Sequence, residues 1–118
     1  MNTHPVLRLS QCQLGQLIGY CTEYRAYLWQ QVTPTPMRNQ VVREIQALQG
    51  RLEKGYIYAQ AESIVLPITG EEQGTVKQLF SSLTQYYAAA PACEQRIRQL
   101  AELTLLRGVV ERTLRQAL

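Results

Sequence analysis

The stretch from Thr69 to Pro91, TGEEQGTVKQLFSSLTQYYAAAP, contains the signals of one complete helix. Thr69 with Glu72 three residues later fits a capping box, in which each side chain accepts a hydrogen bond from the other residue's backbone N–H. Pro91 breaks the helix because proline lacks the backbone N–H that a helix needs. Between these signals, apolar residues recur every three or four positions and predict a single core-facing side: Val76, Leu79, Phe80, Leu83, Tyr87 and Ala90.

The segments on either side predict three more helices with similar start and stop signals. Ser10 is suited to cap a first helix that runs to Val32. Residues 33–36 (TPTP) end that helix and begin the next, with Thr35 as the cap and Pro36 at the first helical position. After Pro91, a fourth helix is expected from about residue 92 to residue 116.

Helices joined by short Pro or Gly breaks predict an all-α, four-helix bundle. The 118 residues suit one domain, residues 1–118, with residues 1–9 as an N-terminal arm. The conformation of the segment after the second helix stays open. Residues 64–68 (IVLPI) are apolar enough to be extended, although Pro67 disfavours a central strand.

The composition argues against catalysis and against a metal or cofactor site. The chain has ten Arg, two Lys, nine Glu and no Asp, and His4 is its single histidine. It has no HExxH motif and no Gly-rich phosphate loop. The three cysteines, Cys12, Cys21 and Cys93, include no CxxC pair, and Cys21 and Cys93 fall on or beside apolar stripes. We therefore expect buried free thiols rather than disulfides or metal ligands. We therefore expect a protein that is not an enzyme and holds no cofactor.

Free thiols suit a reducing compartment. No apolar run approaches the ~18 residues that a membrane span requires, and the N-terminus lacks a cationic and then apolar signal pattern. These features predict a cytoplasmic protein without membrane contact.

The second helix has a basic side. With Arg43 at zero on a helical wheel, Lys54 lies at roughly 20°, Tyr58 at roughly 60° and Arg51 at roughly 80°. Cations around an aromatic ring suit a sugar-phosphate backbone with a stacked base. We expect Arg43, Arg51 and Lys54 to contact phosphates, Tyr58 to stack and Arg38 to support the edge of this surface. An ordinary solvated face is the alternative.

The fourth helix is apolar on two sides. Its main stripe includes Leu103, Leu106 and Val110, while Ile97, Leu105 and Val109 belong to a second stripe on another side. A helix of this kind is either central in its own domain or covered by a partner. We therefore expect Ile97, Leu105 and Val109 to form a protein interface. Self-association would cover them.

Gly15 and Gly19 form a GxxxG pattern in the first helix. Small residues at this spacing let a second helix approach closely. We predict that the two glycines take part in a protein interface, with tolerated exposed glycines as the alternative.

Two short segments resemble a known family. Residues 32–39 (VTPTPMRN) are similar to the segment before the second helix in small subunits of type III CRISPR effector complexes, and residues 58–62 (YAQAE) are loosely similar to a Tyr-Ala stretch in their next helix. The resemblance implies a filament-forming, all-helical subunit that lines RNA or displaced DNA with Arg and Lys and cuts nothing.

Two hypotheses for function follow. The first is a non-catalytic helical subunit of a larger complex that contacts RNA or single-stranded DNA through the second helix. The second is a homodimeric adaptor or assembly protein that binds another protein through its C-terminal helix. Salt-dependent binding to generic RNA or single-stranded DNA would separate the first hypothesis from the second.

Overall fold

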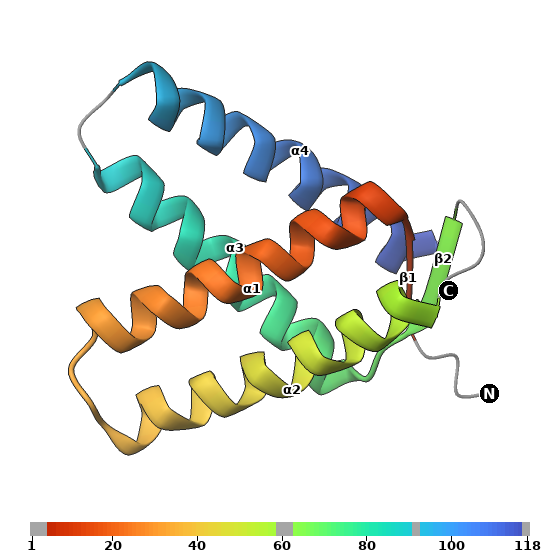
Figure 1. The fold of residues 1–118 in the computed structure, drawn as a ribbon, viewed down its shortest axis with the longest axis horizontal. Helices are drawn as coiled ribbons and strands as arrows, with labels where there is room; N and C mark the ends of the chain where they lie inside the picture. The colour runs from red at the N-terminus through yellow and green to blue at the C-terminus, as the bar shows by residue number, and fades with distance from the viewer. Residues whose placement is uncertain (1–4, 59–62, 91–92, 117–118) are drawn as a thin grey trace.

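The computed structural model describes residues 5–58, 63–90 and 93–116. Within these residues the chain forms four helices and two strands (Figure 1). The helices are α1 (Gln11–Gln31), α2 (Pro36–Tyr58), α3 (Gly70–Ala89) and α4 (Glu94–Gln116). The strands are β1 (Val6–Ser10) and β2 (Ser63–Pro67). The expected helical bundle is therefore present, together with a small sheet.

The helices begin where the capping signals predicted. Ser10 caps α1 in a capping box with Gln13, and Thr69 caps α3 in the predicted capping box with Glu72. At the start of α2, the hydroxyl oxygen of Thr35 accepts a hydrogen bond from the backbone N–H of Arg38 at 3.0 Å. Each cap satisfies a backbone N–H that lacks a partner inside the helix.

The fold is not purely all-α, because part of the expected N-terminal arm is a strand. β1 pairs with β2 in antiparallel register, with Leu7 opposite Leu66 and Leu9 opposite Ile64. Leu7 and Leu9 are buried while Arg8 between them is exposed, which is the alternation of a strand with one covered face. Five residues are too short for this pattern to stand out in a sequence. Pro67 lies in a two-stranded sheet, where every strand is an edge strand that tolerates proline.

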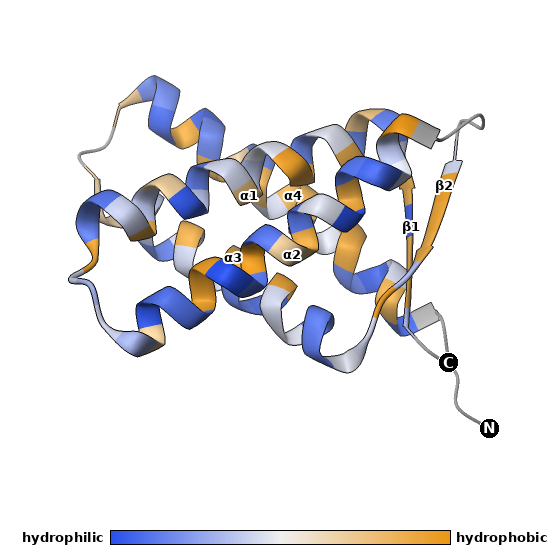
Figure 2. Ribbon diagram, turned by 60° about the horizontal axis from the view of Figure 1, so that its bottom comes forward, coloured by the Kyte–Doolittle hydropathy of each residue, from blue (hydrophilic) through white to orange (hydrophobic). Residues whose placement is uncertain are grey.

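The core is formed by the apolar sides of all four helices and by both strands. Figure 2 shows hydrophobic and hydrophilic residues interleaved along each helix, as amphipathic packing requires. The largest fully enclosed side chains include Phe80 and Leu14, and the hydroxyl of Tyr24 donates to Ser82 at 3.1 Å. α1 therefore packs on α2 and α3, and α4 packs on α3 and β1.

Gly55 in α2 lies against β2. A Cβ atom at this position would lie 2.9 Å from Cδ1 of Leu66, closer than van der Waals contact allows. The glycine therefore lets the strand pack on the helix, although glycine lowers helix propensity.

Among the described residues, no helix is long and apolar enough to span a membrane.

Candidate interaction surfaces

Arg51 lies on the predicted basic side of α2 but contacts other parts of its own chain. Its guanidinium forms an ion pair with Glu72 and donates a hydrogen bond to the carbonyl oxygen of Pro67 at 2.8 Å. The same Glu72 carboxylate accepts the backbone N–H of Thr69 in the cap of α3. Arg51 thus links α2 to the end of β2 and to the first turn of α3.

Arg38 is buried rather than placed at the edge of a cationic surface. Only 7 % of the residue is exposed. Its guanidinium lies 4.6 Å from the ring centroid of Trp29 and donates to the carbonyl oxygen of Leu28 at 3.3 Å. This carbonyl is in the last turn of α1, where a cation interacts favourably with the helix dipole. Arg38 therefore fixes the α1–α2 corner.

Two of the predicted phosphate-binding residues stay on the surface of α2. Arg43 and Lys54 are exposed, and the guanidinium of Arg43 donates to Gln40 at 3.2 Å. The side chain of Tyr58 lies outside the described residues, as do Ala59 to Glu62 of the second resembling segment. In the described part of the predicted set, Arg43 and Lys54 are thus exposed and have no ion pair, while exposed Arg51 and buried Arg38 contact groups of their own chain.

The second stripe of α4 is largely in solvent. Leu105 is 72 % exposed and Ile97 is 64 % exposed. Leu103, Leu106 and Val110 on the opposite side of the same helix are at most 3 % exposed. In Figure 1, α4 lies along one side of the bundle, opposite α2. We call the side of α4 that carries Ile97, Ala101 and Leu105 its outer face.

The remaining predicted interface residues divide between buried and open positions. Val109 is partly buried against the core of its own chain, so it contributes little to the outer face of α4. A Cβ atom on Gly15 would lie 3.6 Å from the ring of Tyr56 in α2, so Gly15 belongs to the α1–α2 contact. At Gly19 such an atom would meet nothing within 4 Å among the described residues.

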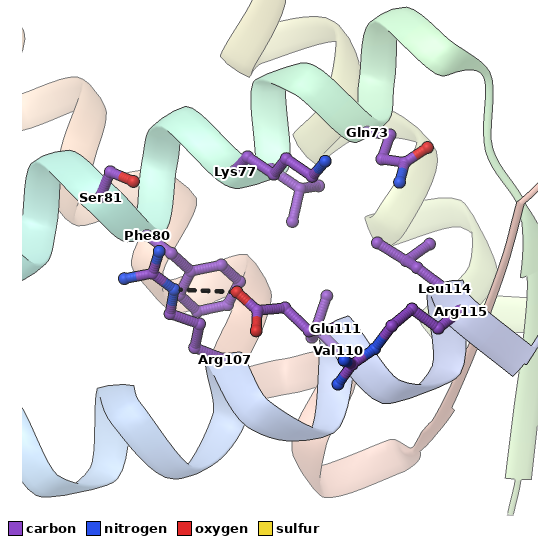
Figure 3. Close-up of a pocket in the computed structure, with 10 residues that line it drawn as sticks. Gln73, Lys77, Phe80, Ser81, Arg107, Val110, Glu111, Leu114 and Arg115 are labelled. Atoms are coloured by element: carbon purple, nitrogen blue, oxygen red, sulfur yellow. Dashed lines mark hydrogen bonds and ion pairs between the residues drawn. The ribbon is translucent and has the colours of Figure 1, made fainter.

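A cleft of about 330 Å³ separates part of α3 from α4. Lys77 from α3 faces Arg107 and Arg115 from α4 across it, and Arg107 is paired with Glu111 at 3.1 Å (Figure 3). The apolar residues beneath are at most 6 % exposed: Val76, Phe80, Val110 and Leu114. A bound molecule would therefore meet an apolar floor together with a charged rim.

A cluster of tyrosines joins α1, α3 and the start of α4. Arg96 lies over the rings of Tyr86 and Tyr87, with its guanidinium carbon 5.6 and 5.3 Å from their centroids. The hydroxyl of Tyr87 donates to the carboxylate of Glu23. Desolvation raises the pKa of Glu23, and the nearby charge of Arg96 partly opposes this shift. The cation thus lies over two rings of its own chain and donates a hydrogen bond to Gln99 at 3.2 Å.

Arg25 in α1 donates to the side-chain oxygen of Gln49 at 3.0 Å. The amide of Gln49 in turn donates to Thr22 at 2.9 Å and to Glu53 at 3.1 Å. This polar network connects α1 to α2 and accounts for the burial of Gln49 at 7 % exposure.

The described residues contain no group of three His, Cys or Glu side chains placed to hold a metal ion. His4 lies outside the described residues. Cys21 is buried, whereas Cys12 and Cys93 are exposed, so the apolar neighbours of Cys93 in the sequence did not lead to its burial.

Comparison of the chain with protein-family models, with curated proteins and with solved structures found no match.

Sequence reasoning missed the internal contacts of Arg38 and Arg51. The signal for Arg51 was present in the predicted capping box, because Glu72 leaves lone pairs free after it accepts the Thr69 N–H. The signal for Arg38 was its place in the first turn of α2, directly after a short turn from the end of α1. No sequence pattern predicts the contact of Arg38 with Leu28 or of Arg51 with Glu72, because each contact depends on how two separate elements pack together.

Proposed function

We propose that this chain is a non-catalytic helical module that joins another protein through the outer face of α4. The observation that supports this proposal is the exposure of Leu105 at 72 % and Ile97 at 64 % on one side of a helix whose other side is buried. Ala101 lies between them and is also exposed. Contiguous exposed apolar residues with a polar surround are typical of protein interaction sites.

The form of this surface favours a helix as the occupant. Ile97, Ala101 and Leu105 follow one another at successive turns, so they make a narrow apolar stripe rather than a broad patch. Charged residues border the stripe, including Arg98 and Glu102, both exposed. An apolar stripe between charged borders is the arrangement by which one amphipathic helix packs on another.

Site-specific photo-crosslinking in cells tests this proposal. A benzophenone amino acid at Thr104, an exposed position beside the stripe, leaves Leu105 in place. Irradiation is expected to give discrete protein adducts. The same probe at Lys54 on α2 is the matched control and should give none of these adducts. Leu105→Glu in the Thr104-probed chain should remove them.

If the Thr104 probe gives no protein adduct, or if its adducts persist unchanged with Leu105→Glu, the outer face of α4 is not a docking surface. A circular dichroism melt of the Leu105→Glu chain checks that a negative result comes from the surface and not from unfolding.

Contact with RNA or single-stranded DNA is the second candidate, as the resemblance to type III CRISPR small subunits implies. One observation favours it. Arg43 and Lys54 lie exposed about three turns apart on the same side of α2, and neither belongs to an ion pair within the described part of the chain.

Filter binding over a range of salt concentrations tests this candidate. The double change Arg43→Gln with Lys54→Gln is expected to reduce the slope of log binding constant against log salt by about one to two units. Each cation that contacts a phosphate releases condensed counterions from the nucleic acid on binding, so a chain without these two cations releases fewer. Lys77→Gln on α3 is the matched control. An unchanged slope in the double variant excludes the α2 surface as a phosphate contact.

A further inference from the structure

Six residues on and beside the outer face of α4 have a palindromic spacing, and Ile97 is not one of them. Steps of four and three residues alternate through the set, as they do along the seam of a two-stranded coiled coil: Glu94, Arg98, Ala101, Leu105, Gly108 and Arg112. At 100° per residue, all of them lie within about 60° of Ala101. The spacing is the same from either end, with its midpoint at the level of Leu103.

We propose that the partner of this face is a second copy of the chain, with the two α4 helices antiparallel and centred at Leu103. This inference rests on the proposed function, since it names the occupant of the same surface. A twofold axis at Leu103 brings Ala101 opposite Leu105 of the second copy and Glu94 opposite Arg112 of the second copy. Such an isologous contact closes on itself and gives a dimer.

Charge complementarity supports the antiparallel direction. Glu94 is at the start of the outer face and Arg112 is near its end, and both are exposed. Within its own chain Glu94 has an ion pair with Arg98 at 3.6 Å, with both side chains more than 70 % exposed. An exposed pair of this kind contributes little and leaves Glu94 free to exchange partners. Parallel helices would instead place like charges together, since Glu94 would face Glu94 and Arg112 would face Arg112.

The sizes of the opposed side chains also match. Leu105, the most exposed apolar residue of α4, would pack over the small side chain of Ala101 in the second copy. Ile97 would lie near Gly108 of the second copy. A Cβ atom on Gly108 would meet nothing within 4 Å among the described residues, so the backbone there is open to a neighbouring helix. Large residues facing small ones allow two helices to approach closely.

One helix on each side gives a small interface. Contacts that bury less than about 1,200 Å² in total belong to the weak and transient class. We therefore expect a dimer that forms at high protein concentration and dissociates on dilution.

Sedimentation equilibrium with charge reversal tests the inference. The purified wild-type chain is expected to rise from its monomer mass of 13.5 kDa towards twice that mass as concentration increases. Glu94→Arg is expected to weaken association about tenfold, because each dimer contains two copies of the pair and both become repulsive. Arg112→Glu should weaken it similarly. The double variant restores opposite charges and should return to within about threefold of wild type.

Lys54→Glu is the matched control for a change of net charge, and it should leave association unchanged. A wild-type chain that stays monomeric at about millimolar concentration overturns the inference. Single variants that leave association unaltered, or a double variant no stronger than either, overturn the proposed register. Glu94 and Arg112 are exposed, so melting curves should show all variants folded.

The photo-crosslinking experiment separates the two proposals. A chain that is monomeric when pure, yet forms Leu105-dependent adducts with a different protein in cells, contradicts the second-copy inference and supports the proposed function. Absence of both self-association and adducts contradicts both.

Discussion

Both α2 and α4 turn one side toward solvent, and the two sides differ in what their side chains contact. On α2, Arg51 forms an ion pair with Glu72 and hydrogen-bonds to Pro67, so a residue that is half exposed is already used within the chain. On α4, Leu105 is 72 % exposed and belongs to the exposed stripe with Ile97 and Ala101.

The difference follows from the reach of the side chains. Arginine has a long stem and five N–H donors, so it finds carbonyl and carboxylate oxygens of its own chain several ångströms from its backbone. Leucine is short and can be covered only by an element that packs directly on it. A cationic pattern in a sequence is therefore weaker evidence for a partner than an apolar stripe that the fold leaves exposed.

The largest expected effect separates the two sides of α4. Leu103 is fully buried, whereas Leu105 is 72 % exposed. Leu103→Ala should lower the free energy of unfolding by about 2–5 kcal/mol, because it removes buried methyl groups and leaves a cavity. Leu105→Ala should change that free energy by no more than about 0.5 kcal/mol in the monomer. Urea unfolding of dilute protein measures both, and equal losses would show that Leu105 is covered within the monomer.

A smaller effect separates two arginines of α2. Arg51→Ala should cost about 1–2 kcal/mol of unfolding free energy, since it removes a charge-assisted hydrogen bond to Pro67 and the partly screened pair with Glu72. Arg43→Ala is the matched control on the same helix and should have an effect near zero, because the hydrogen bond of Arg43 within the described residues is to exposed Gln40. Thermal unfolding measures both variants. Equal decreases in melting temperature would contradict the view that Arg51 stabilises the fold through its own-chain contacts while Arg43 does not.

The third comparison needs no substitution, because it measures how fast the three thiols of the wild-type chain react. Burial raises the pKa of Cys21 to about 12, with Glu53 adding to the rise and Arg25 opposing it. A thiol reagent at pH 8 should modify exposed Cys12 and Cys93 in the folded protein and reach Cys21 only after unfolding. Rapid modification of all three thiols in the folded protein would contradict the burial of Cys21.

The same shift predicts a pH dependence. Folding raises the pKa of Cys21 above its unfolded value of about 9, so its contribution to stability is complete below that pH and is lost as pH rises toward 12. The unfolding free energy of the wild-type chain should therefore decrease as pH rises above about 9, and Cys21→Ala should make this decrease smaller. Chemical denaturation at a series of alkaline pH values measures it.

Much of the helical fold was predictable because its signals are local. The caps at Ser10, Thr35 and Thr69 and the apolar side of α3 involve residues within a few turns of each other. The pairing of β1 with β2 was not predictable, since it joins segments more than fifty residues apart through a five-residue strand. Short strands give too few alternating positions to identify them by pattern.

The exposure of some candidate surface residues could be predicted from the sequence, and that of others could not. The exposure of Ile97 and Leu105 followed from helical periodicity, because their angle from the main stripe of α4 is fixed by the helix itself. The partial burial of Val109 did not follow, since it depends on how widely the core covers α4. The contacts of Arg38 and Arg51 required the positions of other elements. Binding of nucleic acid or of a partner stays a prediction.

Disulfide trapping at Thr104 tests the central claim most directly, in a chain with Cys12→Ser and Cys93→Ser. In an antiparallel pair centred at Leu103, the two copies of residue 104 are about 3 Å apart along the helix axis and those of residue 98 about 15 Å apart. Mild oxidation should therefore yield a disulfide-linked dimer for Thr104→Cys and none for Arg98→Cys, with Leu105→Glu abolishing the first. Equal trapping at both positions, or none at residue 104, would contradict the account.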